Sequence, residues 1–448
     1  MKLRRSAIAQ YALIYLMYII PGSCLFAKFL QGEIKYLALL ALYGFLFVRY
    51  RKYRSGYALR FVALFTVSVL FTRFYTGGGA GINSLFQFLV CVLSTQMAIY
   101  CDKEKFLTRW VKFVTVMAAI SIVFWAAFFA VPSLVNAYPG TVFKTQDLGS
   151  VGYEVEYHGR GLLIYSYLEI HPIRNCGVFT EPGVHQVILN MTLYVLLFWQ
   201  DRLSFKENWQ YRLCVAIVLL AIVTCQSTTG YMGFIMVLAF FFFSSKAERK
   251  YKGIKQFMVT AVALGLVVLL GDYAARGDDS ILYSQFIYKL FGSDGGGLDV
   301  SEGTGQYRMG TMMVCLDIMM HHPLGVGYDI FNLMKNAYAE GLVAASFLQF
   351  PAVFGVLPWL LLMSMLFLPV LTRMKAGPAF LFIFLFINTT LAQTDLMYPA
   401  FCMIPMCLVG VPMAEEKHEE KTEEKPEEKP EGKEEAADEQ NADPVYGQ

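Results

Sequence analysis

The chain is built from long apolar runs separated by short segments rich in lysine and arginine. The runs lie at 8–27, 34–50, 58–75, 82–100, 113–131, 184–199, 213–225, 231–243, 257–270, 353–371, 379–391 and 397–411. Most approach the roughly 17–25 residues that cross a bilayer, and the shorter ones end near side chains that extend to the interface. Charged residues make up 16% of the chain, compared with about a quarter in soluble domains. The pattern predicts an all-α, polytopic membrane protein with about 12 transmembrane helices.

Basic residues recur at alternate boundaries between these runs, and this predicts the orientation. They gather at 2–5, 49–60, 103–112, 206–212, 246–255 and 373–375. Because lysine and arginine concentrate in cytoplasmic loops, these segments and both termini are predicted to be cytoplasmic. The first run is too long for a signal peptide and lacks a small-residue cleavage site, so no cleavable signal is expected.

Two segments between the runs are predicted to be large external loops. The first covers 132–182 and the second covers about 271–342, while the link at 226–230 reads as a tight turn. Most polar residues outside the cytoplasm fall in these two loops. Function is therefore expected on the external side of a multi-pass membrane domain, residues 1–413.

The segment 414–448 differs in composition from the rest of the chain. It holds 14 acidic residues and five lysines, a net charge of −9, which leaves +11 for the remainder of a chain with net charge +2. A tract with so little apolar surface cannot bury a core, so we expect a disordered, acidic cytoplasmic tail. A tail that docks a partner is the alternative.

The nine cysteines show no zinc or redox spacing, and most lie inside the apolar runs. Cys176 and Cys315 are predicted to be external, where a disulfide between them is one hypothesis. The acidic run 294–302 lacks the alternating ligands of a calcium loop, so a flexible Gly-rich loop is expected there. The sequence predicts no metal, no cofactor and no nucleic-acid partner.

A short polar segment, 174–183, precedes the run at 184–199 and reads RNCGVFTEPG. Thr180 is predicted to cap the helix, Glu181 suits the positive end of its dipole, and Pro182 suits its first turn. One interpretation is an ordinary helix start. The other is an anion site in which helix N–H groups and Arg174 bind phosphate oxygens.

In the second external loop, 305–320 is predicted to form an amphipathic helix. By helical spacing, its apolar face consists of Met309, Met312, Met313, Leu316, Met319 and Met320. Arg308, Thr311 and Cys315 share the opposite face. Such a helix is expected to lie flat on the membrane or against the bundle, which would direct Arg308 into a polar cavity. The Pro and Gly residues of 321–327 are predicted to end the helix in a turn.

Three segments together resemble motifs of the bacterial O-antigen polymerase and O-antigen ligase superfamily. They are RxxGxFxEPG at 174–183, STTG at 227–230, and Arg308 with its helix and the HPLGxG turn at 322–327. The segments occur in the superfamily's order and cover roughly residues 174–327. The first six runs resemble the superfamily in hydrophobicity alone.

The resemblance implies a metal-independent glycosyltransferase of the bacterial inner membrane that polymerises a surface polysaccharide (O-antigen, capsule or exopolysaccharide). Its substrate would be an oligosaccharide linked to undecaprenyl pyrophosphate on the periplasmic side, and its partners would be other polysaccharide-assembly proteins. By similarity, Arg174 and Arg308 would bind the pyrophosphate, with Arg160 as a third candidate. Positive side chains there would stabilise the charge that grows as the glycosidic C–O bond breaks.

The chain departs from the superfamily pattern at one place. The ligases carry a His-Asn pair after the Gly-x-Gly turn, and that histidine is taken as catalytic, whereas 336–346 contains no histidine here. This departure favours polymerase over ligase and leaves the base for the acceptor hydroxyl unassigned. The candidates for the base and for further site roles are Glu181, Glu340, His171, His185 and His322.

A transporter, such as a lipid-linked oligosaccharide flippase, is the main alternative from another class. Transporters place ionisable groups near the bilayer midplane and contain paired repeats, and neither feature is evident in this sequence. Arg73 and Asp395 lie near the ends of runs, where snorkelling or helix-terminal roles are expected. A scaffold or receptor that displays the acidic tail would not explain two external loops that carry arginines.

Overall fold

A computed structural model describes residues 5–23, 33–49, 55–77, 82–138, 140–142, 158–161, 163–169, 171–244, 252–280, 283, 304–338, 345–393 and 395–409. The described residues all belong to one compact unit, Met1–Val411. The predicted acidic tail at 414–448 and the acidic run 294–302 lie outside the described residues.

The described chain is mainly helical, as the sequence predicts. The first helices are α1 (Arg5–Ile19), α3 (Glu33–Arg49), α4 (Gly56–Thr76), α5 (Ile82–Cys101), α6 (Phe106–Ala130) and the short α7 (Leu134–Ala137). They are followed by α8 (Pro182–Phe198), α9 (Asn208–Cys225), α10 (Thr228–Ser244) and α11 (Lys252–Arg276), with 3-10 turns at Gln200–Arg202 and Gly277–Asp279. The last helices are α13 (Thr304–His321), α14 (Gly327–Tyr338), α15 (Ser346–Phe354), α16 (Val356–Arg373), α17 (Ala376–Ala392) and α18 (Pro399–Val409).

Five of these helices are long and apolar enough to cross a membrane. They are α4, residues 84–101 of α5, α6, α9 and α16. Shorter apolar helices, among them α8, α17 and α18, coincide with other predicted runs. The protein is therefore a membrane-embedded helical protein, and the count of about 12 spans stays a prediction.

One small antiparallel sheet departs from the all-α prediction. Its strands, in the order β1-β2-β3, are β1 (Gly140–Val142), β2 (His158–Gly161) and β3 (Ser166–Leu168). Strands of three or four residues are too short to give a periodic signal in the sequence. The buried Tyr165 packs with Phe128 of α6 and Val135 of α7, so aromatic contacts hold the sheet against these helices.

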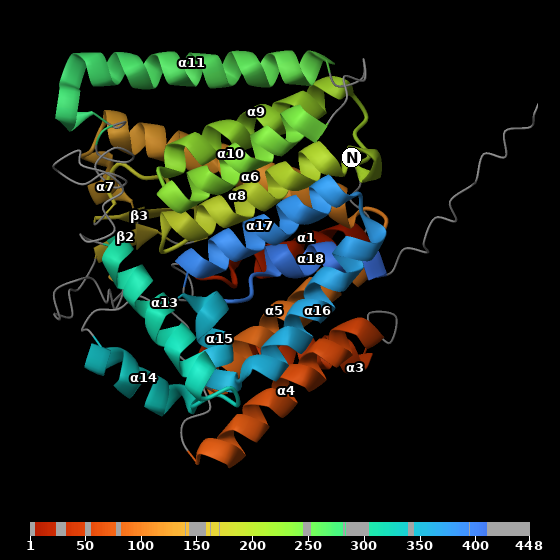
Figure 1. Ribbon diagram of the computed structural model, residues 1–448. Helices are drawn as coiled ribbons and strands as arrows, with labels where there is room; N and C mark the ends of the chain where they lie inside the picture. The colour runs from red at the N-terminus through yellow and green to blue at the C-terminus, as the bar shows by residue number, and fades with distance from the viewer. Residues whose placement is uncertain are drawn as a thin grey trace, which may run out of the picture. The chain divides into compact units, whose positions relative to one another are not determined.

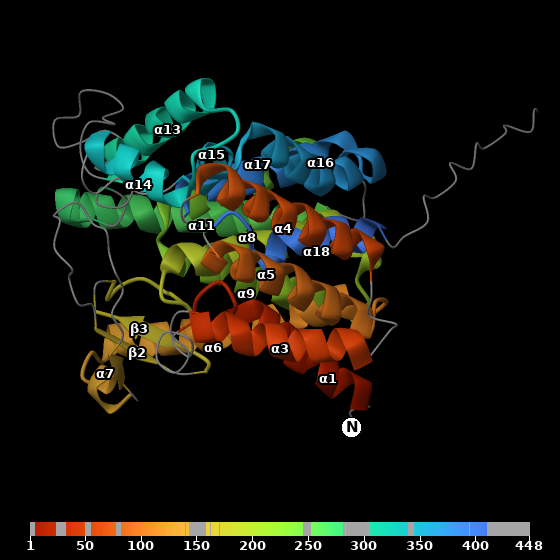
Figure 2. The same ribbon diagram turned by 90° about the horizontal axis from the view of Figure 1, so that it is seen from below.

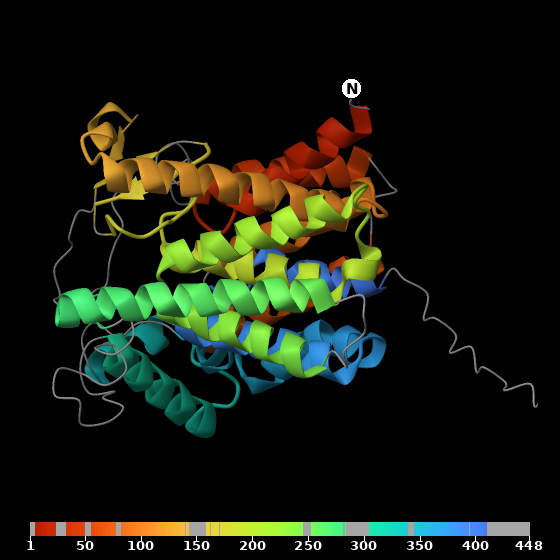
Figure 3. The same ribbon diagram turned by 90° about the horizontal axis from the view of Figure 1, so that it is seen from above.

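The helices form a bundle with two different ends (Figure 1). α7, β2, β3 and α14 gather at one end, called the sheet end below, and α1 begins at the opposite end in both Figure 1 and Figure 2. α11 runs along the outside of the bundle on the side of α9 and α10 (Figure 3). The described parts of 132–182 and 271–342 thus lie at the same end, which the distribution of basic residues predicts to be external.

α8 is the central helix of the bundle. Its residues from Pro182 to Leu197 are buried, and it packs against α6, α9, α10 and α17. Within this apolar core, Trp110 Nε1 on α6 donates a hydrogen bond to Thr192 Oγ1 at 3.2 Å. Because α8 is enclosed along its length, its first turn has a fixed position at the sheet end.

The start of α8 differs from the prediction by one residue. The helix begins at Pro182, as expected, but Glu181 rather than Thr180 is the N-cap, with φ −150° and ψ 134°. The main-chain N–H of Thr180 donates to the carbonyl of Gly22 at 3.3 Å, next to a β-bridge between Ser23 and Phe179. Thr180 therefore lies one residue before the cap, in the segment that pairs with residues 22–23.

The predicted amphipathic helix is present as α13, but it buries the other face. Thr311, Val314, Cys315 and Ile318 are buried where α13 packs against α14 and α15. The exposed apolar side chains on α13 are Met309, Met313, Leu316 and Met320. The expectation that the methionine-rich face packs against the bundle is therefore wrong, because the small and β-branched side chains of the other face allow closer approach to the neighbouring helices. Contact of the methionine-rich face with the membrane surface stays a prediction.

Candidate functional site

Asn175 anchors the segment 174–183 to two helices. Its Nδ2 donates to Ser121 Oγ on α6 at 3.0 Å and to Thr224 Oγ1 on α9 at 2.9 Å. Its Oδ1 accepts from the main-chain N–H of Gly177 at 3.0 Å, and its own N–H donates to the Thr224 carbonyl at 2.9 Å. Asn175 is fully buried, so these four bonds satisfy its polar groups and fix the segment against α6 and α9.

Gly177 makes room for a buried histidine below the segment. Its φ is +59°, and a Cβ at this position would lie 2.8 Å from His185 Cε1, so a glycine is required. His185 is fully buried on α8, with Nδ1 3.4 Å from the Asn175 carbonyl oxygen and 3.5 Å from Cys225 Sγ. His185 is therefore enclosed beneath the segment, and its role in the site stays a prediction.

Arg174 and Glu181 lie on either side of this anchored turn. Arg174 is half-buried, and its main-chain N–H donates to the His171 carbonyl at 3.1 Å. Burial lowers the pKa of the Arg174 guanidinium, while Cys176, Tyr231 and Glu181 act in the opposite direction. An arginine stays protonated in proteins, so the segment presents a partly desolvated cation within electrostatic reach of the exposed Glu181 carboxylate.

The link between α9 and α10, which carries the STTG motif, packs directly on α8. Oriented to satisfy both contacts, the Gln186 side-chain amide donates to the Ser227 carbonyl at 3.2 Å and accepts from the Tyr231 N–H at 3.1 Å. A Cβ on Gly230 would lie 1.9 Å from Gln186 Cδ, and Asn190 Nδ2 donates to the Gly230 carbonyl at 2.8 Å. Glycine at 230 thus allows the second motif to sit against the first turns of α8.

A hydrogen bond joins the start of α8 to the end of α17. Gln393 Nε2 donates to Glu181 Oε1 at 3.2 Å, across 212 positions of sequence. The carbonyl of Gln393 accepts from the Ser346 N–H at 3.3 Å, and Ser346 Oγ donates to the Thr390 carbonyl at 2.9 Å. These bonds connect Glu181 through Gln393 to the first residue of α15.

The third motif segment, 322–327, packs on α15 and on the first residue of α16. The Val326 N–H donates to the Ala352 carbonyl at 3.0 Å, and the Val356 N–H donates to the Pro323 carbonyl at 2.9 Å. Gly325 has φ +84°, and a Cβ there would lie 2.5 Å from the Val353 carbonyl oxygen. The three motif segments are therefore connected through α8 and α15. The second packs on Gln186 and Asn190 of α8, and the first reaches the third through Gln393 and α15.

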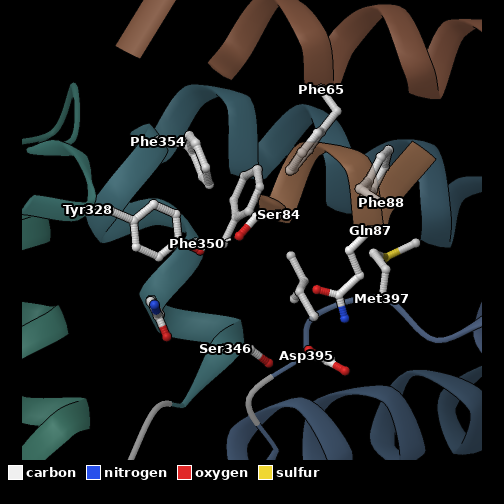
Figure 4. A pocket seen from close by; sticks show the side chains of 12 residues that line it. Phe65, Ser84, Gln87, Phe88, Tyr328, Ser346, Phe350, Phe354, Asp395 and Met397 are labelled. Atoms are coloured by element: carbon white, nitrogen blue, oxygen red, sulfur yellow. Dashed lines mark hydrogen bonds between the residues drawn. The ribbon is translucent and has the colours of Figure 1, made fainter. Parts of the chain in front are cut away.

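Two cavities adjoin the Glu181–Gln393 contact. The smaller is bordered by Gly183, Asn190, Ser227, Asn388 and Gln393, among others. The larger lies between α4, α5, α14, α15 and the link before α18 (Figure 4). Ser346 and Asp395 line the larger cavity, which places it next to Gln393 in the chain and in space.

The remaining candidates from the sequence have different surroundings. Arg160 lies on β2, and its Nη1 donates to the carbonyls of Val135 and Asn136 at 3.3 Å each, so it holds the sheet to α7. His171 is half-buried in the turn before Arg174.

In the second predicted loop, His322 is exposed directly after α13, and its N–H donates to the Ile318 carbonyl at 2.7 Å. Arg308 lies on α13 on the same helical face as the buried Thr311 and Cys315, but its side chain lies outside the described residues. Glu340 is also outside them.

Two half-buried charged residues, Asp395 and Lys335, were missed by sequence reasoning. Asp395 was expected to be helix-terminal, yet it lines the larger cavity. Lys335 on α14 is half-buried; burial lowers the pKa of its ammonium group, and Cys315 acts in the opposite direction. The sequence signal for Asp395 was a carboxylate in a short external link between two apolar runs.

The disulfide hypothesis is wrong. The eight cysteines within the described residues, including Cys176 and Cys315, are all free. Both of these are buried on different elements, and burial raises the pKa of the Cys315 thiol to about 12. Among the residues the structure describes, no group of three His, Cys, Asp or Glu side chains is placed to hold a metal ion.

No protein-family model, curated protein or solved structure matches this chain.

Proposed function

We propose that this chain joins oligosaccharide repeat units, carried on undecaprenyl pyrophosphate, into a surface polysaccharide at the external face of the bacterial inner membrane. The observation that supports this most is the linkage of the three motif segments around the Glu181–Gln393 hydrogen bond. A half-buried arginine, a carboxylate and two cavities lie along the segments that these contacts connect, at the sheet end of a membrane-embedded bundle. Such a site suits a substrate with an anionic, membrane-borne head group and a polar sugar chain.

The proposed reaction is a glycosyl transfer with a pyrophosphate leaving group. A hydroxyl oxygen of the acceptor sugar forms a bond to the anomeric carbon of the donor, and the bond from that carbon to the pyrophosphate oxygen breaks. The electron pair leaves with undecaprenyl pyrophosphate, whose growing charge Arg174 and Arg308 would stabilise. The acceptor's proton passes to a carboxylate, for which Glu181 is the described candidate and Glu340 the other.

Glu181 has surroundings that favour its charged form. It lies at the N-cap of α8, where the helix dipole stabilises a negative charge, and it accepts a hydrogen bond from Gln393. The Glu181 carboxylate and the Arg174 guanidinium also attract each other electrostatically. These contacts hold the Glu181 carboxylate at the start of α8, where it is the proposed general base.

Deleting the gene and separating the surface polysaccharide on a gel tests the proposal. Accumulated single repeat units support a polymerase, whereas long unligated chains would indicate a ligase and lipid-linked units confined to the cytoplasmic side would indicate a flippase. Complementation with Arg174→Ala or Arg308→Ala should fail to restore long chains although both variants insert in the membrane. Arg276→Ala, an exposed arginine at the end of α11, is the matched control and should restore them. Normal long chains in both test variants would rule out the pyrophosphate role.

A further inference from the structure

Lys335 is a half-buried cation in the last turn of α14, at the sheet end of the bundle. The first turn of α14 is fixed against the two helices that flank the link at 77–81. A Cβ at Gly327 would lie 2.9 Å from Thr76 Oγ1 at the end of α4, and the Tyr328 hydroxyl is 2.9 Å from Ser84 Oγ on α5. Because α14 is anchored at this end, Lys335 has a defined position two turns further along the helix.

The side of α14 that packs on the protein carries Lys335. Tyr328, Phe331 and Lys335 follow i, i+3, i+7 spacing, and Phe331 is fully buried. Ile330 and Leu333, on the other side of the helix, are exposed. α14 lies beside α13 and packs on α15 (Figure 1). Lys335 therefore projects from the protein-facing side of α14, which explains why it is half-buried.

Arg308 and Lys335 occupy the facing sides of two neighbouring helices. Lys335 interacts electrostatically with Cys315, which is buried on α13. Arg308, Thr311 and Cys315 follow i, i+3, i+7 spacing, so they share one face of α13. Arg308 precedes Cys315 by seven residues, about 10 Å along the helix axis. Two positions with long cationic side chains are thus brought to the same side of α13.

The charge of Lys335 is not neutralised within the described part of the chain. Its ammonium has no ion-pair or hydrogen-bond partner among these residues. The Cys315 thiol stays protonated at neutral pH, because burial raises its pKa to about 12. Since burial penalises an unpaired charge, an anionic ligand would stabilise Lys335 in this position.

The position of Lys335 also departs from the distribution of the other lysines. All the other lysines whose side chains the structure describes lie in the segments predicted to be cytoplasmic; they are Lys103, Lys105, Lys112, Lys206 and Lys375. Lys335 lies instead in the second predicted external loop. Orientation in the membrane therefore does not account for a lysine at this position, whereas a ligand on the external side would.

We propose that Lys335 binds the pyrophosphate of the lipid-linked substrate together with Arg308, an inference that rests on the proposed function. The pyrophosphate of such a substrate carries a negative charge on each of its two phosphates, so two cations on facing helices can share it. Lysine donates to phosphate oxygens as a compact point charge, and arginine does so through a planar fork. Partial burial strengthens the attraction, because the local dielectric is lower than that of water.

Binding of undecaprenyl pyrophosphate without any sugar tests the inference. The probe is radiolabelled undecaprenyl pyrophosphate, titrated against the full-length protein in phosphatidylcholine nanodiscs. Lys335→Met keeps the length of the side chain but removes the charge, and it should weaken binding about ten-fold. Lys335→Arg should retain most of the affinity. Lys375→Met, which removes an exposed lysine at the opposite end of the bundle, is the matched control and should bind like the wild type.

Thermal unfolding separates a ligand-binding role from a structural one. Lys335→Met removes a half-buried charge that has no partner among the described residues, so its unfolding temperature should equal or exceed that of the wild type. A lower unfolding temperature together with weaker binding would show a structural role and overturn the inference. Unchanged affinity in Lys335→Met, or an equal loss in Lys375→Met, would also overturn it.

A phospholipid head group offers the same phosphate chemistry, and nanodiscs that contain phosphatidylglycerol distinguish the two ligands. Phosphatidylglycerol should lower the affinity for undecaprenyl pyrophosphate by less than two-fold. Strong competition that disappears in Lys335→Met would assign the lysine to the surrounding lipid and overturn the inference. If Lys335-dependent binding is found but the wild type transfers no sugar, the proposed function fails and the assignment of Lys335 stands.

Discussion

Replacing Asn175 tests whether this buried amide fixes the position of the site. Asn175→Ala removes three side-chain hydrogen bonds, to Ser121, Thr224 and Gly177. At about 1 kcal/mol each, the loss is about 3 kcal/mol, and the Gly177 N–H, buried without its acceptor, adds about 1 kcal/mol or more. The free energy of unfolding should therefore fall by about 4 kcal/mol, with a parallel loss of transfer activity because Arg174 is the adjacent residue.

The assay is unfolding of the purified protein in mixed micelles by SDS titration, compared across matched variants. Ser121→Ala removes one acceptor of Asn175 and should cost about 1 kcal/mol. Asn136→Ala removes an exposed amide on α7 and should change stability by less than about 0.5 kcal/mol. If Asn175→Ala costs no more than Asn136→Ala, the anchoring argument is refuted.

Three further predictions concern stability and the tail. Gly325→Ala should lower the free energy of unfolding by more than about 2 kcal/mol, because its φ is +84° and the new Cβ would meet the Val353 carbonyl. Gly271→Ala, in open space on α11, is the control and should not destabilise the protein in the same SDS titration. Arg160→Met should speed hydrogen exchange in the sheet, because it removes the bonds from Arg160 to the Val135 and Asn136 carbonyls. The polysaccharide chains should shorten less than with Arg174→Ala, and an equal loss would show that Arg160 binds pyrophosphate. Deleting 415–448 should leave polymer length unchanged on a gel, and a strong loss would show that the tail docks an essential partner.

The bundle and the segments that carry the site were predictable from the sequence because both depend on local patterns. Apolar runs of membrane length predict helices directly, and Pro182 correctly predicts the first residue of α8. The Gly and Pro residues after α13 likewise predict its end, since α13 stops at His321.

Features that depend on distant contacts were not predictable. Asn175 is one polar residue among many in the sequence, and its role appears when α6 and α9 are brought beside it. The Glu181–Gln393 hydrogen bond joins segments far apart in the chain, and the larger cavity combines residues from five separate elements.

The buried face of α13 was also missed, for a different reason. Periodicity shows that a helix has two unlike faces, but it does not show which one packs when the surroundings include both lipid and protein. In a membrane protein, small residues such as Cys315 favour close helix packing, and methionines such as Met313 can face outward.

Transfer by the purified protein is the most direct test of the proposed function. The protein is reconstituted in liposomes with one undecaprenyl-pyrophosphate-linked repeat unit, and both chain length and released undecaprenyl pyrophosphate are measured without added metal or sugar nucleotide. The account predicts one released carrier for each linkage formed, at least about a hundred-fold loss in Arg174→Ala with unchanged thermal unfolding, and wild-type rates in Arg276→Ala. Absence of any transfer by the folded wild type, or equal transfer by Arg174→Ala, would contradict it.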